Sequence, residues 1–393
     1  MKTLILGDCH IGRSLTIGKP GIGSALNSRI VDQINILDWT LKIAIDYDVS
    51  NIICTGDIFQ DAKPHPTIIA LFVAWVKRCI DNDISLHIIA GNHDILRSGQ
   101  YYMSALDIIS EFDTDDVYIY KQVSTLHTNG ASFTLFPFRD RRSFQTDSND
   151  AAIKLLSTKI PYEVSSIDRS NAKILIGHLA IEGSIFVGDE VDDMGNELFC
   201  PVSMFNQYDY VWMGHVHKPQ VLSKSPYVSH IGSMDISDFG ETDHKKVIVL
   251  FDPDASTPYK YLEIPTRPLK QVSISVPDNI TNTTQYVVDE IRKQDSLTKA
   301  IVKVGITLNS PDLASVDKLV INKSVMDMGA FHIARITEEK KVAAIKTLSI
   351  NENIDNTVNE QTAIKMYAKS NIDEQIRNDF ISLAMDIVAE SKE

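Results

Sequence analysis

The sequence is poor in cysteine, lacks long apolar runs and has no excess of basic residues. Its cysteines are scattered without paired spacing, which argues against a disulfide framework or a cysteine zinc site. No apolar stretch approaches the roughly 20 residues that a membrane-spanning helix requires. The apolar run at the start is short and reaches Asp8 at once, so we expect no signal peptide. These absences predict a cytoplasmic protein without a membrane segment. The four cysteines are Cys9, Cys54, Cys79 and Cys200.

The charge of the chain is acidic. Its 38 Lys and Arg residues against 52 Asp and Glu residues give a net charge of −14. Such a chain repels nucleic acid on average, so tight DNA binding would need a local basic patch or a second, more basic subunit. A hydrophobic content of 44% and a charged content of 23% are typical of a globular protein, and the length suits roughly two or three domains.

Three apolar runs in the first ninety residues each end in polar side chains. They are Lys2–Leu6, Ile52–Thr55 and Ser85–Ala90. Between them, apolar residues from Ile30 to Ile45 share one helical face, and Pro66 is placed to open a second helix. Alternating strands and helices, with polar residues after each strand, predict an α/β fold with a site at the carboxyl ends of the strands.

Strand candidates recur later in the chain at looser spacing. Few helical patterns separate them, so we expect the second half of this domain to be largely antiparallel. Two of these candidates are again followed by Gly and His. The candidates are Val117–Tyr120, Ser132–Phe136, Lys173–Ile176, Tyr210–Met213, Tyr227–Ile231 and Val247–Phe251.

A domain boundary is expected near Pro265–Pro268. Beyond it, strand candidates alternate with a helix that Asn282 and Gln285 open as a capping box, which predicts a small α+β domain. Thr357 and Glu360 form a similar box before the final helices. The expected division is a main domain at 1–265, a small domain at 270–340, a linker at 341–356 and a helical tail at 357–393.

Eight polar side chains follow the predicted strands. Oxygen and imidazole ligands without cysteine suit Mn, Fe or Zn better than Ca. Asp-x-His and His-x-His spacing directs alternate side chains to the same side at a strand end. Each motif alone is weak or moderate, because polar turns such as Gly-Asn are common, but five of them in order favour a dinuclear metal site for phosphoester hydrolysis. The eight residues are Asp8, His10, Asp57, Asn92, His93, His178, His215 and His217.

The ordered motifs GDCHIG, GDIF, GNHD, GH and GHVH resemble those of the calcineurin-like metallophosphoesterase superfamily. Within it, Tyr210–Gln220 and Gly232–Glu241 are similar to the SbcD family of DNA-repair exonuclease subunits. The resemblance covers about residues 1–265 by motif and the remainder by architecture. It implies a metallophosphoesterase β-sandwich flanked by helices, a capping domain at 270–340, and C-terminal helices at 357–393 that bind an SMC-like ATPase of the SbcC type.

The resemblance also implies a role for each polar residue. One divalent metal ion would bind Asp8, His10, Asp57 and His217, and the other would bind Asp57, Asn92, His178 and His215, with Mn²⁺ as the favoured ion. His93 would stabilise the pentacoordinate phosphorus or protonate the leaving 3′ oxygen, and Asp94 would orient His93 or stabilise the turn. Gln60 departs from family members that place a histidine near the site.

By this resemblance, the protein would be a metal-dependent DNA nuclease acting in recombination or repair. It would degrade duplex ends from 3′ to 5′ and nick single strands, as a homodimer of bacterial or bacteriophage type bound to its ATPase. Helices at Ile30–Ile45 or Pro66–Ile80 would contribute to the dimer. One alternative is a stand-alone metallophosphoesterase acting on small phosphoesters, which the acidic charge favours slightly. Another is a structural subunit that anchors the ATPase.

The remaining histidines and a small arginine cluster have less specific interpretations. Arg139, Arg141 and Arg142 could contact a DNA backbone, or they could belong to a solvated loop with ion pairs to Asp140. The other histidines match no motif and are expected at the surface or as hydrogen-bonded core residues. They are His65, His87, His127, His230, His244 and His332.

Overall fold

The first of two large sheets carries the strands predicted in the first ninety residues. The computed structural model describes residues 1–22, 26–98, 101–111, 115–165, 171–187, 198–341, 368 and 377–390. In the first sheet the strand order is β16-β15-β1-β2-β3-β6. The four strands from β1 to β6 are parallel, and β15 and β16 add to them antiparallel. The strands are β1 (Lys2–Leu6), β2 (Val49–Cys54), β3 (Ser85–Ile89), β6 (Val117–Tyr120), β15 (Val247–Phe251) and β16 (Tyr259–Glu263).

Two helices, α1 (Ser28–Asp46) and α2 (Pro66–Ile80), cover the outer face of this sheet. Pro66 stands in the first turn of α2, as predicted, and the His65 side chain accepts a hydrogen bond from the backbone N–H of Thr67. The indole N–H of Trp75 donates to the carbonyl oxygen of Leu37 at 2.7 Å, which joins the two helices. Burial of these apolar faces fixes the helices against the sheet.

The second sheet has the strand order β13-β14-β12-β9-β8-β7. Its central strands β8, β9, β12 and β14 are parallel to one another, and only the outer strands β7 and β13 are antiparallel to their neighbours. The expectation of a largely antiparallel second half is therefore wrong. The strands are β7 (Ser124–Thr128), β8 (Ala131–Phe136), β9 (Ala172–His178), β12 (Tyr210–Gly214), β13 (Gln220–Lys224) and β14 (Tyr227–His230).

The parallel pairing depends on crossover segments that have little periodic signal. Helix α4 (Asn149–Ser165) connects β8 to β9 and places only Ala152 and Leu156 in the fully buried core. The connection from β9 to β12 contains a single short 3₁₀ turn, Val202–Phe205. Because parallel strands need such crossovers, missing α4 in the sequence led to the wrong strand direction.

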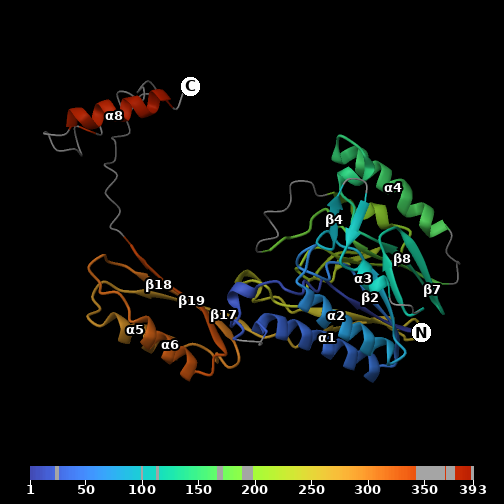
Figure 1. Cartoon of the computed structure of the whole chain (residues 1–393), viewed down its shortest axis with the longest axis horizontal. Helices are drawn as coiled ribbons and strands as arrows, with labels where there is room; N and C mark the ends of the chain where they lie inside the picture. The colour runs from blue at the N-terminus through green and yellow to red at the C-terminus, as the bar shows by residue number, and fades with distance from the viewer. Residues whose placement is uncertain are drawn as a thin grey trace.

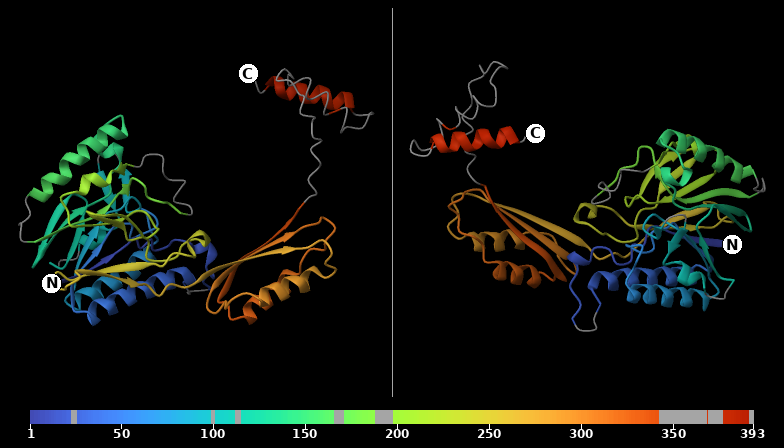
Figure 2. Two further views of the ribbon diagram at one scale, coloured as in Figure 1. Left: turned by 180° about the vertical axis from the view of Figure 1, so that it is seen from behind. Right: turned by 45° about the horizontal axis from the view of Figure 1, so that its top comes forward.

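The two sheets face each other across a shared apolar layer. Ile5, Ile53 and Ile89 of the first sheet pack in one buried cluster with Phe133 and Trp212 of the second. This arrangement of two mixed sheets with flanking helices, seen in Figure 2, confirms the predicted α/β sandwich. Shorter elements complete this part of the chain: β4 (Ile95–Ser98), β5 (Tyr101–Ser104), α3 (Asp107–Ser110), β10 (Ala180–Ile181) and β11 (Phe199–Cys200).

A separate three-stranded sheet follows the sandwich. Its strands β17 (Leu269–Val276), β18 (Ile301–Leu308) and β19 (His332–Lys340) are all parallel, with β18 in the middle. Helices α5 (Thr283–Arg292) and α6 (Lys318–Asp327) lie together on one face of it (Figure 1). The Asn282 side chain accepts a hydrogen bond from the backbone N–H of Gln285, which confirms the predicted helix start. We call residues 269–340 the three-stranded unit.

The C-terminal tail is described only in part. Helix α8 (Arg377–Glu390) contains the apolar positions Phe380 and Leu383 that predicted a helix there. The predicted linker at 341–356 and the helix start at Thr357 lie outside the described residues, apart from Lys341. No helix in the described part of the chain is long and apolar enough to cross a lipid bilayer.

A buried ion network joins the three-stranded unit to the sandwich. The fully buried guanidinium of Arg29, in α1, contacts the carboxylates of Asp32 at 2.8 Å and Asp235 at 2.5 Å. Asp32 also accepts hydrogen bonds from Arg267, whose guanidinium stacks 3.8 Å from the centre of the Phe331 ring in the three-stranded unit. The network thus links α1, the segment after β14 and the three-stranded unit.

We expect Arg29→Ala to lower the free energy of unfolding by about 3–5 kcal/mol, because it leaves buried carboxylates without their cation. Arg78→Ala is a matched control, since Arg78 pairs with Asp38 at a half-exposed position and should cost less than about 1 kcal/mol. Chemical denaturation of both variants measures the difference. Equal losses for the two variants would show that the buried network has no special role in stability.

Candidate metal centre

The structure brings all eight predicted polar side chains together at one edge of the sandwich. They lie in five loops at the carboxyl ends of β1, β2, β3, β9 and β12. Five of them are at most 3% exposed and form the floor of the site: Asp8, His10, Asp57, His178 and His217. Asn92, His93 and His215 are half-buried and form its mouth. A substrate would therefore approach from the side of these three residues.

Asp57 lies at the centre of the cluster. Its Oδ2 atom is 3.4 Å from Nε2 of His10 on one side and 3.3 Å from Nε2 of His178 on the other. Its Oδ1 atom accepts a hydrogen bond from the backbone N–H of His93 at 2.9 Å. One carboxylate oxygen thus stands between two groups of ligand-capable atoms, as a bridging ligand requires.

The two groups flank Asp57. In the first, Nε2 of His10 and Nε2 of His217 are 3.0 Å apart, and a carboxylate oxygen of Asp8 lies within 4.8 Å of ligand atoms of both. In the second, Oδ1 of Asn92 lies 2.8 Å from Nε2 of His178 and 3.1 Å from Nδ1 of His215. These groups match the two ligand sets that the family resemblance implies.

The spacing of these atoms fits divalent metal ions. Neighbouring ligands of an octahedral ion with bonds of about 2.1 Å lie about 3.0 Å apart, and the distances within the cluster range from 2.8 to 3.4 Å. The facing nitrogens of His10 and His217 would also repel each other unless a proton or a cation lay between them. The donor set of imidazoles, carboxylates and one amide suits Mn, Fe or Zn.

The charge of the cluster points the same way. Burial alone would raise the pKa of Asp57, but the imidazoles of His178 and His93 hold that pKa well below its usual range, so the central carboxylate is charged. Burial opposes a charge on His178, yet the Asp57 carboxylate outweighs it and raises the pKa of His178 to about 10. Burial raises the pKa of Asp8 to about 6. A bound metal ion would replace these protons as the counter-charge.

The backbone around Asp57 is adapted to the cluster. Asp57 itself has a φ of 47° and His215 a φ of 81°, in a region that non-glycine residues seldom occupy and that often marks a functional site. At Gly91 an added Cβ would overlap Oδ1 of Asp57. The glycine of GNHD is therefore needed because the central carboxylate lies directly against the backbone at this position.

Surrounding groups fix the orientation of the cluster. The carbonyl oxygen of Thr55 accepts a hydrogen bond from Nδ1 of His178 at 2.9 Å, and the carbonyl oxygen of Gln60 accepts one from Nδ1 of His93 at 2.8 Å. The side chain of Asp94 accepts from three backbone N–H groups, those of Ile58, Phe59 and Gly91. Asp94 therefore stabilises the turn, and Gln60 acts on His93 through its backbone.

Three charged residues near His217 were missed in the sequence. Nη1 of Arg13 lies 2.8 Å from Nδ1 of His217. On the same histidine, Oε1 of Glu241 lies 3.8 Å from Nδ1, and Lys246 forms a fully buried ion pair with Glu241 at 2.9 Å. Arg13 follows His10 by three residues, and Glu241 ends the Gly232–Glu241 motif, so both were within reach of motif analysis.

The other sequence candidates lie outside the cluster. Arg142 pairs with Asp140 at 3.2 Å, and Arg139 donates to the carbonyl oxygens of Phe138 and Lys121, so the loop interpretation with an ion pair to Asp140 describes their contacts. His87 is buried, with hydrogen-bond contacts to Tyr120 and Asn51, as expected for a core histidine.

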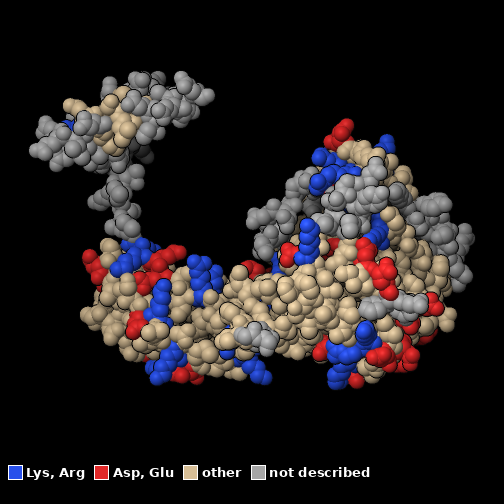
Figure 3. Space-filling model, viewed as in Figure 1, with Lys and Arg blue, Asp and Glu red and all other residues tan. Residues whose placement is uncertain are grey.

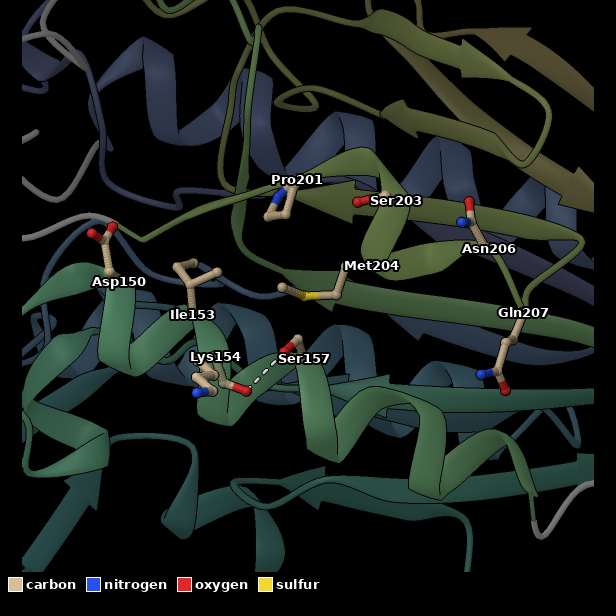
Figure 4. Close-up of a pocket in the computed structure, with 9 residues that line it drawn as sticks. All are labelled: Asp150, Ile153, Lys154, Ser157, Pro201, Ser203, Met204, Asn206 and Gln207. Atoms are coloured by element: carbon tan, nitrogen blue, oxygen red, sulfur yellow. Dashed lines mark hydrogen bonds between the residues drawn. The ribbon is translucent and has the colours of Figure 1, made fainter.

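A hollow of about 610 Å³ lies elsewhere, between α4 and the turn at 201–207. Figure 4 shows that α4 contributes Asp150, Ile153, Lys154 and Ser157 to its wall. None of the eight clustered residues lines it. The lining offers no group of side chains suited to metal binding, so we assign the chemistry to the cluster at the strand ends.

Comparisons with known proteins agree with this geometry. Two curated relatives, each described as the SbcD-type subunit of the nuclease SbcCD, come from Staphylococcus saprophyticus and Staphylococcus epidermidis. Each is 26% identical over 284 residues, which covers 70% of this chain and 71% and 72% of the relatives. These matches confirm the resemblance to the SbcD family.

Among solved structures, a dimetal phosphatase from Danio rerio matches with a TM-score of 0.38 and 12% identity, over 67% of this chain and 98% of that one. The sequence model of the calcineurin-like phosphoesterases matches residues 1–219, which is more than half of the chain and includes all eight clustered residues. The chain belongs to the calcineurin-like phosphoesterase family.

Proposed function

We propose that this chain is the nuclease subunit of an ATPase–nuclease complex and hydrolyses DNA phosphodiester bonds with two divalent metal ions. The observation that carries the proposal is the position of Asp57 Oδ2 between the two ligand groups, 3.4 Å from His10 and 3.3 Å from His178. The two relatives support the choice of DNA, since both are described as nuclease subunits. We propose Mn²⁺ as the bound ion.

In the proposed mechanism, each residue keeps the role that its position allows. Asp57 would contact both ions, with Asp8, His10 and His217 on one side and Asn92, His178 and His215 on the other. Bound metal ions would neutralise the phosphodiester and supply an activated water for its hydrolysis. The seven residues would hold the ions and orient the scissile phosphate between them.

His93 is proposed to act on the substrate. A ring nitrogen of His93 lies within 4.8 Å of ligand atoms of His10 and Asp57. Its Nδ1–H is held by the carbonyl oxygen of Gln60, so the opposite nitrogen is oriented for the substrate. As an imidazolium it would stabilise charge on the phosphorus oxygens or give a proton to the leaving 3′ oxygen.

The acidic charge supports a division of labour with a partner. On the face shown in Figure 3, acidic and basic side chains are interspersed, without one large basic patch among the described residues. A chain with a net charge of −14 would then rely on an ATPase subunit for much of its DNA affinity. The experiment that tests the function is metal-dependent digestion of linear DNA, compared with a nucleotide monoester and an aryl phosphodiester. Hydrolysis of the small esters alone would favour a stand-alone phosphoesterase.

We propose that the helical tail binds the ATPase and that residues 270–340 form a capping domain. Deleting residues 357–393 should abolish co-purification with the ATPase, because the tail supplies the docking helices, and should leave Mn²⁺-dependent nuclease activity unchanged, because the tail carries none of the clustered residues. Pull-down and nuclease assays on the same preparations measure both. Retained co-purification would contradict the assignment.

We further propose a homodimer located in the cytoplasm, where a bacterial or bacteriophage enzyme meets its DNA. The outer surfaces of α1 and α2 are candidates for the dimer contact, since Val31 is 41% exposed and Ile69 and Val73 are half-buried there. Light scattering of the purified chain determines whether the dimer forms.

A further inference from the structure

The loop that follows β10 is held rigidly beside the mouth of the metal centre. The side-chain amide of Gln220 accepts a hydrogen bond from the backbone N–H of Ile185 at 2.9 Å and donates one to the carbonyl oxygen of Ile185 at 3.0 Å. Ser184 Oγ contacts Nε2 of His230 at 2.9 Å, and Nδ1 of His230 donates to the carbonyl oxygen of Gly214 at 3.0 Å. These contacts fix the loop to the strands on either side of His215.

This fixed loop presents apolar side chains next to His215. Ile185 is 55% exposed although its backbone is clamped on both sides. The ring of Phe186 is half-buried, with its centre 6.3 Å from that of His215 and 5.9 Å from that of Phe199. Behind His215 lies Phe138, which is buried and 5.9 Å away. The second ligand group is thus bordered by an apolar and aromatic wall.

Neither the proposed metal chemistry nor the fold accounts for this wall. An exposed isoleucine gains little from the fold, and its rigid placement removes conformational freedom without an apolar partner in the described residues. A phosphodiester between nucleosides carries a flat, apolar-faced base beside its charged phosphate. Aromatic side chains next to a phosphate-binding site are the usual surface on which unpaired bases stack.

We propose that Ile185 and Phe186 form a stacking surface for the base of a nucleotide adjacent to the scissile phosphodiester. This inference rests on the proposed nuclease function and narrows its substrate class to nucleic acid with an unstacked base at the point of cleavage, such as a frayed end or a single strand. Gln220 and His230 are positioning residues for this surface. The occupant is a base of the substrate because the wall is continuous with the metal centre through His215.

The experiment uses oligothymidylates in which one central phosphodiester is cleavable and all other linkages are methylphosphonates. One version has both bases beside the cleavable bond, and two versions lack the base on its 5′ or its 3′ side. The full-length protein is assayed with Mn²⁺ as wild type, Phe186→Ala and Phe186→Trp. Ile108→Ala serves as a matched control, because Ile108 is 54% exposed in α3, outside the clustered loops.

We expect the wild type to cleave the substrate with both bases at least about fivefold faster than one of the two abasic versions. Phe186→Ala should lose this preference and cleave both at the lower rate, so that removing the base and removing the ring are not additive. Phe186→Trp and Ile108→Ala should keep the preference. Melting temperature and metal content of each variant establish that it is folded and loaded.

Two results would overturn the inference while leaving the nuclease function in place. One is equal cleavage of all three substrates by the wild type. The other is a loss in Phe186→Ala that multiplies with the loss from base removal, which would mean that Phe186 only supports the loop. Absence of cleavage of every substrate would instead overturn the nuclease function and this inference together.

Discussion

Replacing Asp57 with alanine is expected to remove both metal ions and to lower Mn²⁺-dependent phosphodiester hydrolysis at least about a thousandfold. The reason is its position, since one oxygen of this carboxylate faces ligand atoms of both groups, at 3.4 Å from His10 and 3.3 Å from His178. The measurements are the metal content of the purified protein and kcat/KM on a DNA substrate. No other single change in the cluster should affect both ions equally.

Asp61→Ala provides the control for Asp57→Ala. Asp61 is an exposed carboxylate four residues further along the same loop, so its loss changes the charge near the site without touching the cluster. The control should keep both ions and full activity. If Asp57→Ala retained two ions per chain, its assignment as the bridging carboxylate would be wrong.

Replacing His93 with alanine should lower kcat by about 10²–10⁴-fold while the metal ions stay bound. His93 borders the mouth of the site and is held by Gln60, but it belongs to neither of the two proposed ligand sets. Its loss would remove a group that acts in the transition state and leave the ligands intact. Kinetics and metal analysis on one preparation separate these effects.

Asn92→Ala is the matched comparison for His93→Ala, since the two residues are neighbours in GNHD. Oδ1 of Asn92 contacts both His178 and His215, so its loss should weaken binding of one ion, and added Mn²⁺ should restore part of the activity. Added metal should not rescue His93→Ala. Full activity of His93→Ala with metal bound would disprove its proposed role.

Much of the site could be predicted from the sequence because its ligands follow apolar strands in short motifs. The carboxyl ends of neighbouring parallel strands meet at one edge, so Asp8, Asp57 and Asn92 were expected to come together, and the structure places them together. Asp94 was predicted either to orient His93 or to stabilise the turn, and its three backbone contacts identify the second role.

The remaining features depend on contacts between distant parts of the chain. Arg29 meets Asp235 across 206 residues, and neither stands in a pattern that indicates its partner. The direction of the second sheet was wrong because α4 has weak apolar periodicity, and the crossover that it forms decides whether β8 and β9 run parallel. The clamp of Gln220 on Ile185 likewise follows from the fold, since nothing in the sequence near Ile185 indicates it.

The central claim is that this metal centre hydrolyses DNA. The most direct measurement is digestion of end-labelled duplex DNA by the purified chain with Mn²⁺, with product ends mapped and with Asp57→Ala as the inactive reference. We predict Mn²⁺-dependent release of nucleotides from the 3′ ends by the wild type and no release by Asp57→Ala. Equal DNA degradation by the two proteins, or no degradation by a wild type that contains both metal ions and hydrolyses a small phosphoester, would contradict the account.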